Sequence, residues 1–178
     1  MSPAGPEPRL ALLVARDGGR AHDDAVIVLG LLDLVAAGAW RMERTGLRRR
    51  WRLRRVTAPP PERRALAALD DGLTGAPQEG GVVPVQALGW WMRHYGIGAT
   101  RVRRAALEDP PAAGEPPPAP GRRASDLDVA LGGFAVGDDE RDFAAKLLRA
   151  RDRPTGLAGD AHNGDNMQAA TRYGAPGL

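Results

Sequence analysis

The sequence predicts a mainly α-helical fold: one compact helical domain with a winged-helix-like β-hairpin near residues 39–56. Three observations lead to this fold class. Apolar residues recur at helical spacing from Asp23 to Ala37, they recur at every second position after Gly38, and helical spacing returns after Pro61. A chain of 178 residues also suits a single domain with a single core.

The first third of the domain is expected to begin with two apolar segments. Residues 1–8 carry three prolines and are expected to be disordered. The stretch RLALLVARDGGR then fits a short helix or strand that ends in a glycine turn. The next helix begins at the acidic pair Asp23 and Asp24 and ends near Gly38. Because it is apolar on nearly every side, we expect it in the core.

Two strands are expected directly after this helix. Trp40 and Met42 alternate with charged residues, and Trp51 and Leu53 alternate with arginines, which is typical of strands with one buried face. The segment 41–55 holds eight arginines and only one glutamate. The hairpin should therefore have one apolar face, packed on the core, and one strongly cationic face.

The remaining segments complete a helical domain over residues 9–107. Leucines at helical spacing predict a helix after residue 61, and two further short helices follow the glycine-rich loop at 75–81. The segments after the domain are a proline-rich linker at 108–121, a C-terminal segment at 122–153 with a loosely attached helix at 138–153, and a disordered tail at 154–178.

Several classes of chemistry find no support in the sequence. Cysteine is absent, and none of the three histidines has a second one at metal-ligand spacing, so no metal or other cofactor is expected. HDD at 22–24 fits a helix start, and GDAHNGDN at 159–166 fits a disordered tail. No nucleophile or nucleotide-binding motif occurs. We therefore expect a non-enzymatic protein.

The cysteine-free composition and the sequence start indicate a cytoplasmic protein. The start lacks the charged and apolar regions of a signal peptide. The longest apolar stretch, 25–40, is too short to span a bilayer. The protein is thus expected to be soluble, or peripheral on the inner face of the membrane.

Positive charge concentrates in the first third of the chain. Residues 1–60 contain 11 basic and 6 acidic groups, a net of +5, within a total of +3. An anionic partner should bind there, and the candidate contacts are Arg48, Arg50, Arg52 and Arg54. Two other readings stay open: the arginines form a plain solvated face, or they reflect a GC-rich coding sequence, since Lys146 is the only lysine among 25 basic residues.

Four ordered motifs resemble a known family. LALLVARDGG, GLLDLVAAGAW, RMERTGLRRRWRLRRV and ERRALAALDDGL are similar, in order and spacing, to the amino-terminal half of the Golgi phosphoprotein 3 family. VQALGWWMRHY is similar to a later helix of that family. The resemblance covers residues 9–107 and is most specific over 29–56.

This resemblance implies a mostly helical domain that associates peripherally with membranes. Eukaryotic members recognise phosphatidylinositol 4-phosphate through a tryptophan and arginines, and the family's arginine pair three residues apart would correspond to Arg101 and Arg104. The chain departs from the pattern at Ile27, where the family has an arginine, and at His22, where it has a tryptophan. The proline-rich linker replaces the hydrophobic hairpin of the family. The resemblance therefore implies binding to anionic surfaces more directly than binding to one phosphoinositide.

The sequence thus predicts a peripheral protein that binds anionic, phosphoinositide-like lipid headgroups through the hairpin arginines and Arg101 and Arg104. The alternative is a winged-helix nucleic-acid-binding protein with a basic wing. The helix Val26–Ala37, which would enter the major groove, offers no arginine, asparagine or glutamine to base edges. The oligomeric state stays open.

Overall fold

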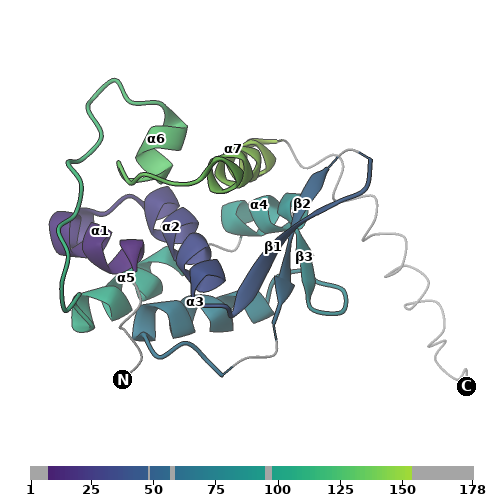
Figure 1. Cartoon of the computed structure of the whole chain (residues 1–178), viewed down its shortest axis with the longest axis horizontal. Coiled ribbons are helices and arrows are strands. Elements are labelled where there is room, and N and C mark those ends of the chain that lie inside the picture. The colour runs from purple at the N-terminus through teal and green to yellow at the C-terminus, as the bar shows by residue number, and fades with distance from the viewer. Residues whose placement is uncertain (1–7, 48, 57–58, 95–97, 154–178) are drawn as a thin grey trace, which may run out of the picture.

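The computed structural model describes residues 8–47, 49–56, 59–94 and 98–153. Within these ranges the chain forms a mainly helical domain with a β-hairpin, as predicted, and a third strand extends the hairpin to a three-stranded antiparallel sheet (Figure 1). The termini predicted to be disordered lie outside the described residues, except Pro8. The elements in chain order are α1 Arg9–Asp17, η1 Gly18–Arg20, α2 Asp23–Ala36, β1 Trp40–Thr45, β2 Arg50–Arg55, α3 Arg64–Thr74, β3 Val82–Pro84, α4 Val85–His94, α5 Ala99–Glu108, α6 Asp126–Ala130 and α7 Asp138–Asp152.

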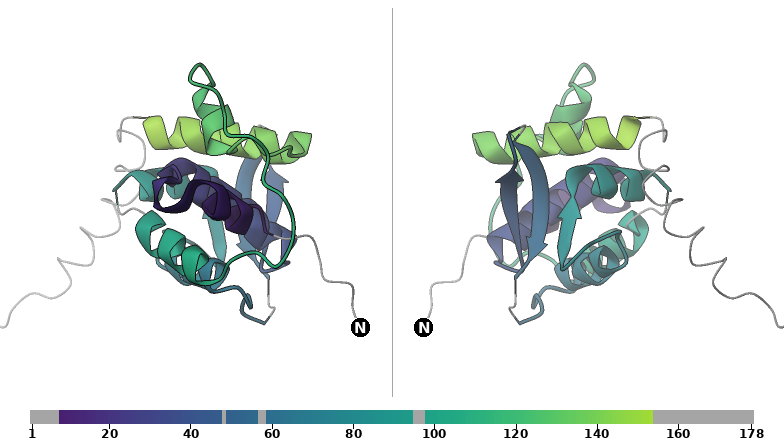
Figure 2. Two further views of the ribbon diagram at one scale, coloured as in Figure 1. Left: turned by 90° about the vertical axis from the view of Figure 1, so that its left-hand side faces the viewer. Right: turned by 90° about the vertical axis from the view of Figure 1, so that its right-hand side faces the viewer.

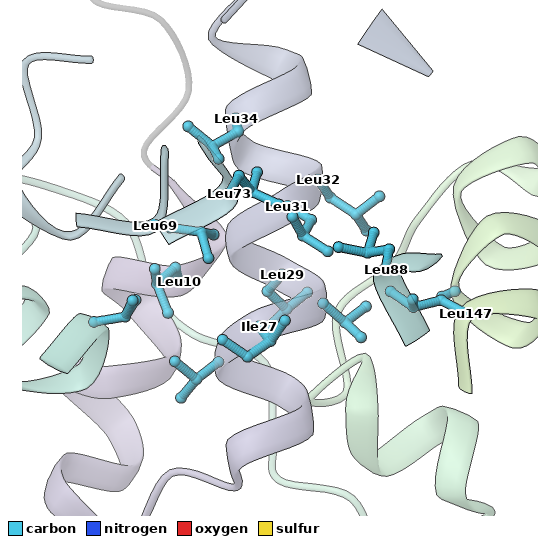
Figure 3. Close-up of a cluster of buried hydrophobic side chains, with 14 of the residues drawn as sticks. Leu10, Ile27, Leu29, Leu31, Leu32, Leu34, Leu69, Leu73, Leu88 and Leu147 are labelled. Carbon is cyan, nitrogen blue, oxygen red and sulfur yellow. The ribbon is translucent and has the colours of Figure 1, made fainter. Parts of the chain in front are cut away.

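Helix α2 forms the centre of the core, as its apolar composition predicts. Ten of its fourteen residues are buried. Figure 3 shows leucines of α1, α3, α4 and α7 around it, among them Leu10, Leu69, Leu88 and Leu147. A helix surrounded in this way needs no polar face.

The chain reverses from α2 into the sheet at Gly38. This glycine has φ +78°, a conformation that is strained for other residues. The N–H of Gly38 donates to the carbonyl of Val35 at 3.0 Å, and the N–H of Ala39 donates to that of Leu34 at 3.1 Å. These two bonds form a Schellman motif, which satisfies the last carbonyls of the helix.

The predicted hairpin is confirmed and is extended by a third strand. β1 pairs with β2 so that Met42 lies opposite Leu53, and β2 pairs with β3 so that Leu53 lies opposite Val83. Leu53 and Val83 are buried against the helices. β3, which has three residues, was not predicted.

A buried carboxylate joins the first two helices. Asp33 of α2 accepts the backbone N–H of Leu10 at 2.8 Å, so it satisfies a donor in the first turn of α1. Burial raises the pKa of Asp33 to about 6, although the hydrogen bonds from the α1 backbone and the nearby Arg9 guanidinium act in the opposite direction. Arg9 in turn bonds Glu140 of α7 at 2.8 Å, so α1, α2 and α7 meet at one polar cluster.

The prediction of a loosely attached helix at 138–153 is wrong. This segment is α7, which lies against the rest of the domain (Figure 2). Its Phe143 and Leu147 are fully buried in the same core as α2. The helix packs on α4 at Gly89, where an added Cβ would lie 2.6 Å from Cβ of Ala150. Burial of the apolar stripe of α7 holds this helix on the rest of the domain.

The proline-rich linker is extended, as predicted, but it is fixed to the domain. Residues 110–121 contain no helix or strand. Arg16 of α1 donates from Nη1 to the carbonyl oxygens of Pro117, at 2.7 Å, and of Gly132, at 2.8 Å. The linker thus carries the chain along α1 to α6 and α7, and the core extends from Leu10 to Leu148.

Candidate anion-binding surface

The alternation along β2 separates folding residues from charged ones. Trp51 and Leu53 are 3% and 1% exposed, whereas Arg50, Arg52 and Arg54 lie on the opposite face of the strand. This arrangement follows from the period of two in side-chain direction. The prediction of an apolar face and an arginine face on the hairpin is therefore confirmed.

Part of this arginine face is neutralised by Glu43 of β1. Its carboxylate lies 2.8 Å from Nη2 of Arg52 and 3.0 Å from Nε of Arg54. Desolvation would raise the pKa of Glu43, but the hydrogen bonds from Arg54 and Arg52 outweigh it and hold the pKa below its usual value. Arg52 and Arg54 are thus engaged within the sheet, and Arg50 is not.

Two other hairpin arginines hold the sheet to helices. Arg44 lies 4.4 Å from the centre of the Trp51 ring and 2.7 Å from Asp139 of α7. Arg55 lies 3.4 Å from Asp70 of α3, which also accepts the indole N–H of Trp40. These arginines stabilise the packing of the hairpin and leave little charge for a ligand.

Asp142 of α7 completes the attachment of the hairpin. It accepts the indole N–H of Trp51 at 2.8 Å and pairs with Lys146 at 3.0 Å. The hydrogen bond from Trp51 is the main cause that lowers the pKa of Asp142. The Trp51 ring also meets Phe143 edge-to-face, with ring centres 6.1 Å apart. Figure 2 shows α7 lying across the turn end of the hairpin.

A cationic pocket of about 310 Å³ lies where α7 meets the start of β2. Its basic side chains come from two segments almost a hundred residues apart, and among the described residues no carboxylate lines it. We call these five residues the pocket cations: Arg49, Arg50, Lys146, Arg149 and Arg153.

Four of the pocket cations have no ionic partner in the part of the chain that the structure describes. Lys146 pairs with Asp142, but the four arginines form no ion pair with any residue that the structure describes. Of these five residues, only Arg50 was predicted as a contact. The basic residues near the end of the segment 138–153 were the available sequence signal, but the segment was expected to be only loosely attached to the domain.

The tip of the hairpin carries an exposed apolar side chain. Leu47 is fully exposed in the turn between β1 and β2 and directly follows Gly46, which has φ +72°. Arg49 and Arg50 come two and three residues after Leu47 and line the pocket. The predicted contact Arg48 lies outside the described residues. Sequence reasoning did not single out Leu47, because one leucine in a turn breaks no pattern.

The structure does not bring Arg101 and Arg104 to this end of the molecule. Both are exposed on α5, which packs against α3, α1 and α2, away from the turn of the hairpin (Figure 1). Arg101 lies 3.2 Å from Asp71 of α3, and Arg104 forms no ion pair with described residues. The six predicted contacts therefore do not form one site.

Two other sequence interpretations concern acidic and histidine residues. His22 precedes α2, and its Nδ1 accepts the backbone N–H of Asp24, so the predicted helix start is confirmed. No group of three or more potential metal ligands occurs in the described ranges, and the segment 159–166 lies outside them. Within the same ranges, no helix has both the length and the apolar character needed to cross a bilayer.

Comparisons with known proteins do not place the chain in a family. No family model, no curated protein and no solved structure matches it. The resemblance to the Golgi phosphoprotein 3 family therefore stays a prediction from the sequence motifs, and the function has to be argued from the geometry described above.

Proposed function

We propose that the protein binds peripherally to anionic membrane surfaces, on the cytoplasmic face, and acts by binding rather than by catalysis. The turn end of the hairpin is the contact. The observation that carries this proposal is the fully exposed Leu47 beside Arg49 and Arg50, which form no ion pair with the residues that the structure describes. An apolar tip next to free cations suits the boundary between headgroups and acyl chains.

At such a surface the binding free energies of the apolar tip and of the arginines add. Full burial of a leucine side chain is worth about 1.5–3 kcal/mol. Each arginine close to an anionic leaflet contributes about 1 kcal/mol. The four free pocket arginines lie on the same end of the molecule as Leu47, so they approach the membrane together. Neither part binds firmly alone, and the combination gives reversible attachment.

The nucleic-acid alternative finds less support in the geometry. α2, the helix that would enter the major groove, is the buried centre of the core. A phosphate backbone could therefore contact only the arginine-bearing surface, and it would gain nothing from Leu47, because that side chain stays in water on a duplex. The two functions differ in their dependence on this leucine.

Co-sedimentation with vesicles tests the proposal. Wild type is expected to bind vesicles that contain phosphatidylserine and to stay in solution with pure phosphatidylcholine. Leu47→Ser should weaken the binding roughly tenfold, since most of one leucine burial is lost. Leu107→Ser is the matched control, because Leu107 is the other large apolar side chain described as exposed and lies on α5.

Three results would contradict the proposal. The first is equal binding of wild type to both vesicle types, the second is equal binding by the two serine variants, and the third is retention of duplex DNA by a wild-type protein that does not bind anionic vesicles. The last result would favour the nucleic-acid alternative. Binding to DNA should in any case fall steeply with salt and be the same for both serine variants.

A further inference from the structure

The pocket cations form an arrangement that is unfavourable without a counterion. Lys146 and Arg149 lie three residues apart on one face of α7, and Arg49 and Arg50 face them from the start of β2. Like charges at this spacing on a helix destabilise it. Dispersed surface arginines would avoid this cost, so the concentration of positive charge in one pocket of about 310 Å³ indicates an anionic ligand.

The charge balance of the pocket indicates how much negative charge the ligand carries. Asp142 already accepts hydrogen bonds from Trp51 and Lys146 and lies 3.4 Å from Arg44, so it compensates Lys146 and no other pocket cation. The four pocket arginines stay uncompensated by described residues. One phosphomonoester carries a charge of about −1.5 to −2 at neutral pH, so a single phosphate would balance only half of them. Two or three adjacent phosphoryl groups would balance all four.

The helix ends at the pocket are compatible with an anion. Val85 and Gln86, the first residues of α4, line the pocket, so the partially positive end of that helix borders it. The carbonyl oxygens of residues 151–153 at the end of α7 each lie 3.5 Å from Nη1 of Arg93, which offsets the partial negative charge there. Neither helix end therefore opposes the arginines.

The lining also limits the chemistry of the ligand. The Trp51 ring and Val85 are buried, so guanidinium groups and the Gln86 amide provide most of the exposed donors. A guanidinium binds two phosphate oxygens at once. Nothing in the described lining offers an open aromatic face for a base. The pocket therefore suits a ligand with clustered phosphates and has no stacking site for an aromatic base.

We propose that this pocket binds a ligand with two or three adjacent phosphoryl groups. The source is either a soluble oligophosphate or a lipid headgroup with neighbouring phosphomonoesters. The inference goes beyond membrane docking and does not depend on it: both proposals use the pocket arginines, but binding of a phosphate ligand in the pocket needs no contribution from Leu47. A pocket that binds oligophosphate can exist in a protein that ignores membranes.

Titration calorimetry of the full chain at fixed ionic strength tests the proposal. Pyrophosphate and tripolyphosphate are expected to bind about tenfold or more tightly than orthophosphate, because each added phosphoryl group gains charge-assisted hydrogen bonds. The variant Arg49→Gln/Arg149→Gln should lose this preference. The control Arg122→Gln/Arg123→Gln makes the same charge change at exposed residues outside the pocket and should keep it.

The single lysine provides a second readout. Lys146 is the only lysine of the chain, so its acetylation by an amine-reactive acetylating reagent can be followed at one side chain by mass spectrometry. Tripolyphosphate is expected to slow this acetylation several-fold, and orthophosphate at equal ionic strength should not. Thermal melting of each variant shows that it is folded before it is titrated.

The outcomes separate this inference from the membrane proposal. Equal affinity for orthophosphate and tripolyphosphate, or equal binding by the two double variants, would overturn the inference. If tripolyphosphate releases the protein from vesicles bearing a phosphatidylinositol bisphosphate, the natural ligand is the lipid headgroup. If tripolyphosphate binds without releasing the protein, the natural ligand is a soluble oligophosphate. Leu47→Ser should weaken vesicle binding and leave the tripolyphosphate titration unchanged.

Discussion

Truncation of Leu147 should destabilise the whole domain, although this residue lies in the segment that the sequence places outside it. Leu147 has no exposed surface, and Figure 3 shows it beside Leu88 of α4. Leu147→Ala removes three carbons from a site enclosed by helices, so the surroundings can collapse little, and we expect a loss of about 3–4 kcal/mol. For a chain of this length that loss corresponds to a decrease in melting temperature of roughly 6–16 °C.

Two spectroscopic probes distinguish a shared core from a helix that unfolds alone. Far-UV circular dichroism follows all helices, and fluorescence follows the four tryptophans, Trp40 and Trp51 in the hairpin and Trp90 and Trp91 in α4. Both signals should shift together to lower temperature in Leu147→Ala. Arg141→Ala, at an exposed pair on the same helix, should change stability by less than about 1 kcal/mol. A dichroism curve with two separate transitions, an early one that accounts for a single helix and a later one for the rest, would refute a common core.

Two further predictions concern charged residues. Joint replacement of Arg50, Arg52 and Arg54 by glutamine should change the free energy of unfolding, measured in urea, by less than about 1 kcal/mol. Trp51→Ala should lower the same free energy by about 3–5 kcal/mol. Equal losses in the two variants would mean that the arginine face is itself buried. Burial raises the pKa of Asp33 in the folded state to about 6, above its ordinary value of 3.8, so the protonated form favours folding. This contribution, roughly 3 kcal/mol, is complete below about pH 4 and is lost as the pH rises through about 6. Asp33→Asn should flatten that part of the stability profile, and a variant with the wild-type slope would assign it to other groups.

The parts of the fold that could be predicted are those specified by neighbouring residues. The change of period at Gly38 located the hairpin, because side-chain direction depends only on local backbone geometry. The position of α2 in the core could be predicted in the same way, because the directions of its apolar side chains around the helix also follow from local backbone geometry. Val82–Pro84 could not be recognised as a strand, since three residues show no period and their pairing is supplied by β2.

The attachment of α7 left a sequence signal that was given too little weight. Phe143, Leu147 and Leu148 form a stripe at helical spacing, which predicts one buried face. The proline-rich segment before it suggested a flexible spacer. An extended chain is flexible only when nothing holds it, however, and Arg16 binds this one at the carbonyl of Pro117 and binds the chain after α6 at the carbonyl of Gly132. Prolines predict the conformation of a linker but not its freedom.

The candidate site shows the limit of sequence reasoning about charge. Eight arginines between residues 41 and 55 suggested a single cationic face, yet four of them are paired with carboxylates: Arg44, Arg52, Arg54 and Arg55. Which arginines remain free depends on where Glu43, Asp70 and the acids of α7 lie in space. α7 neutralises part of the hairpin through its first turns, and its second half supplies Lys146 and Arg149 to the pocket, with Arg153 directly after the helix. Packing therefore moves the free positive charge from the strand face to the pocket beside the turn, and a ligand that seeks uncompensated arginines should bind there rather than along β2.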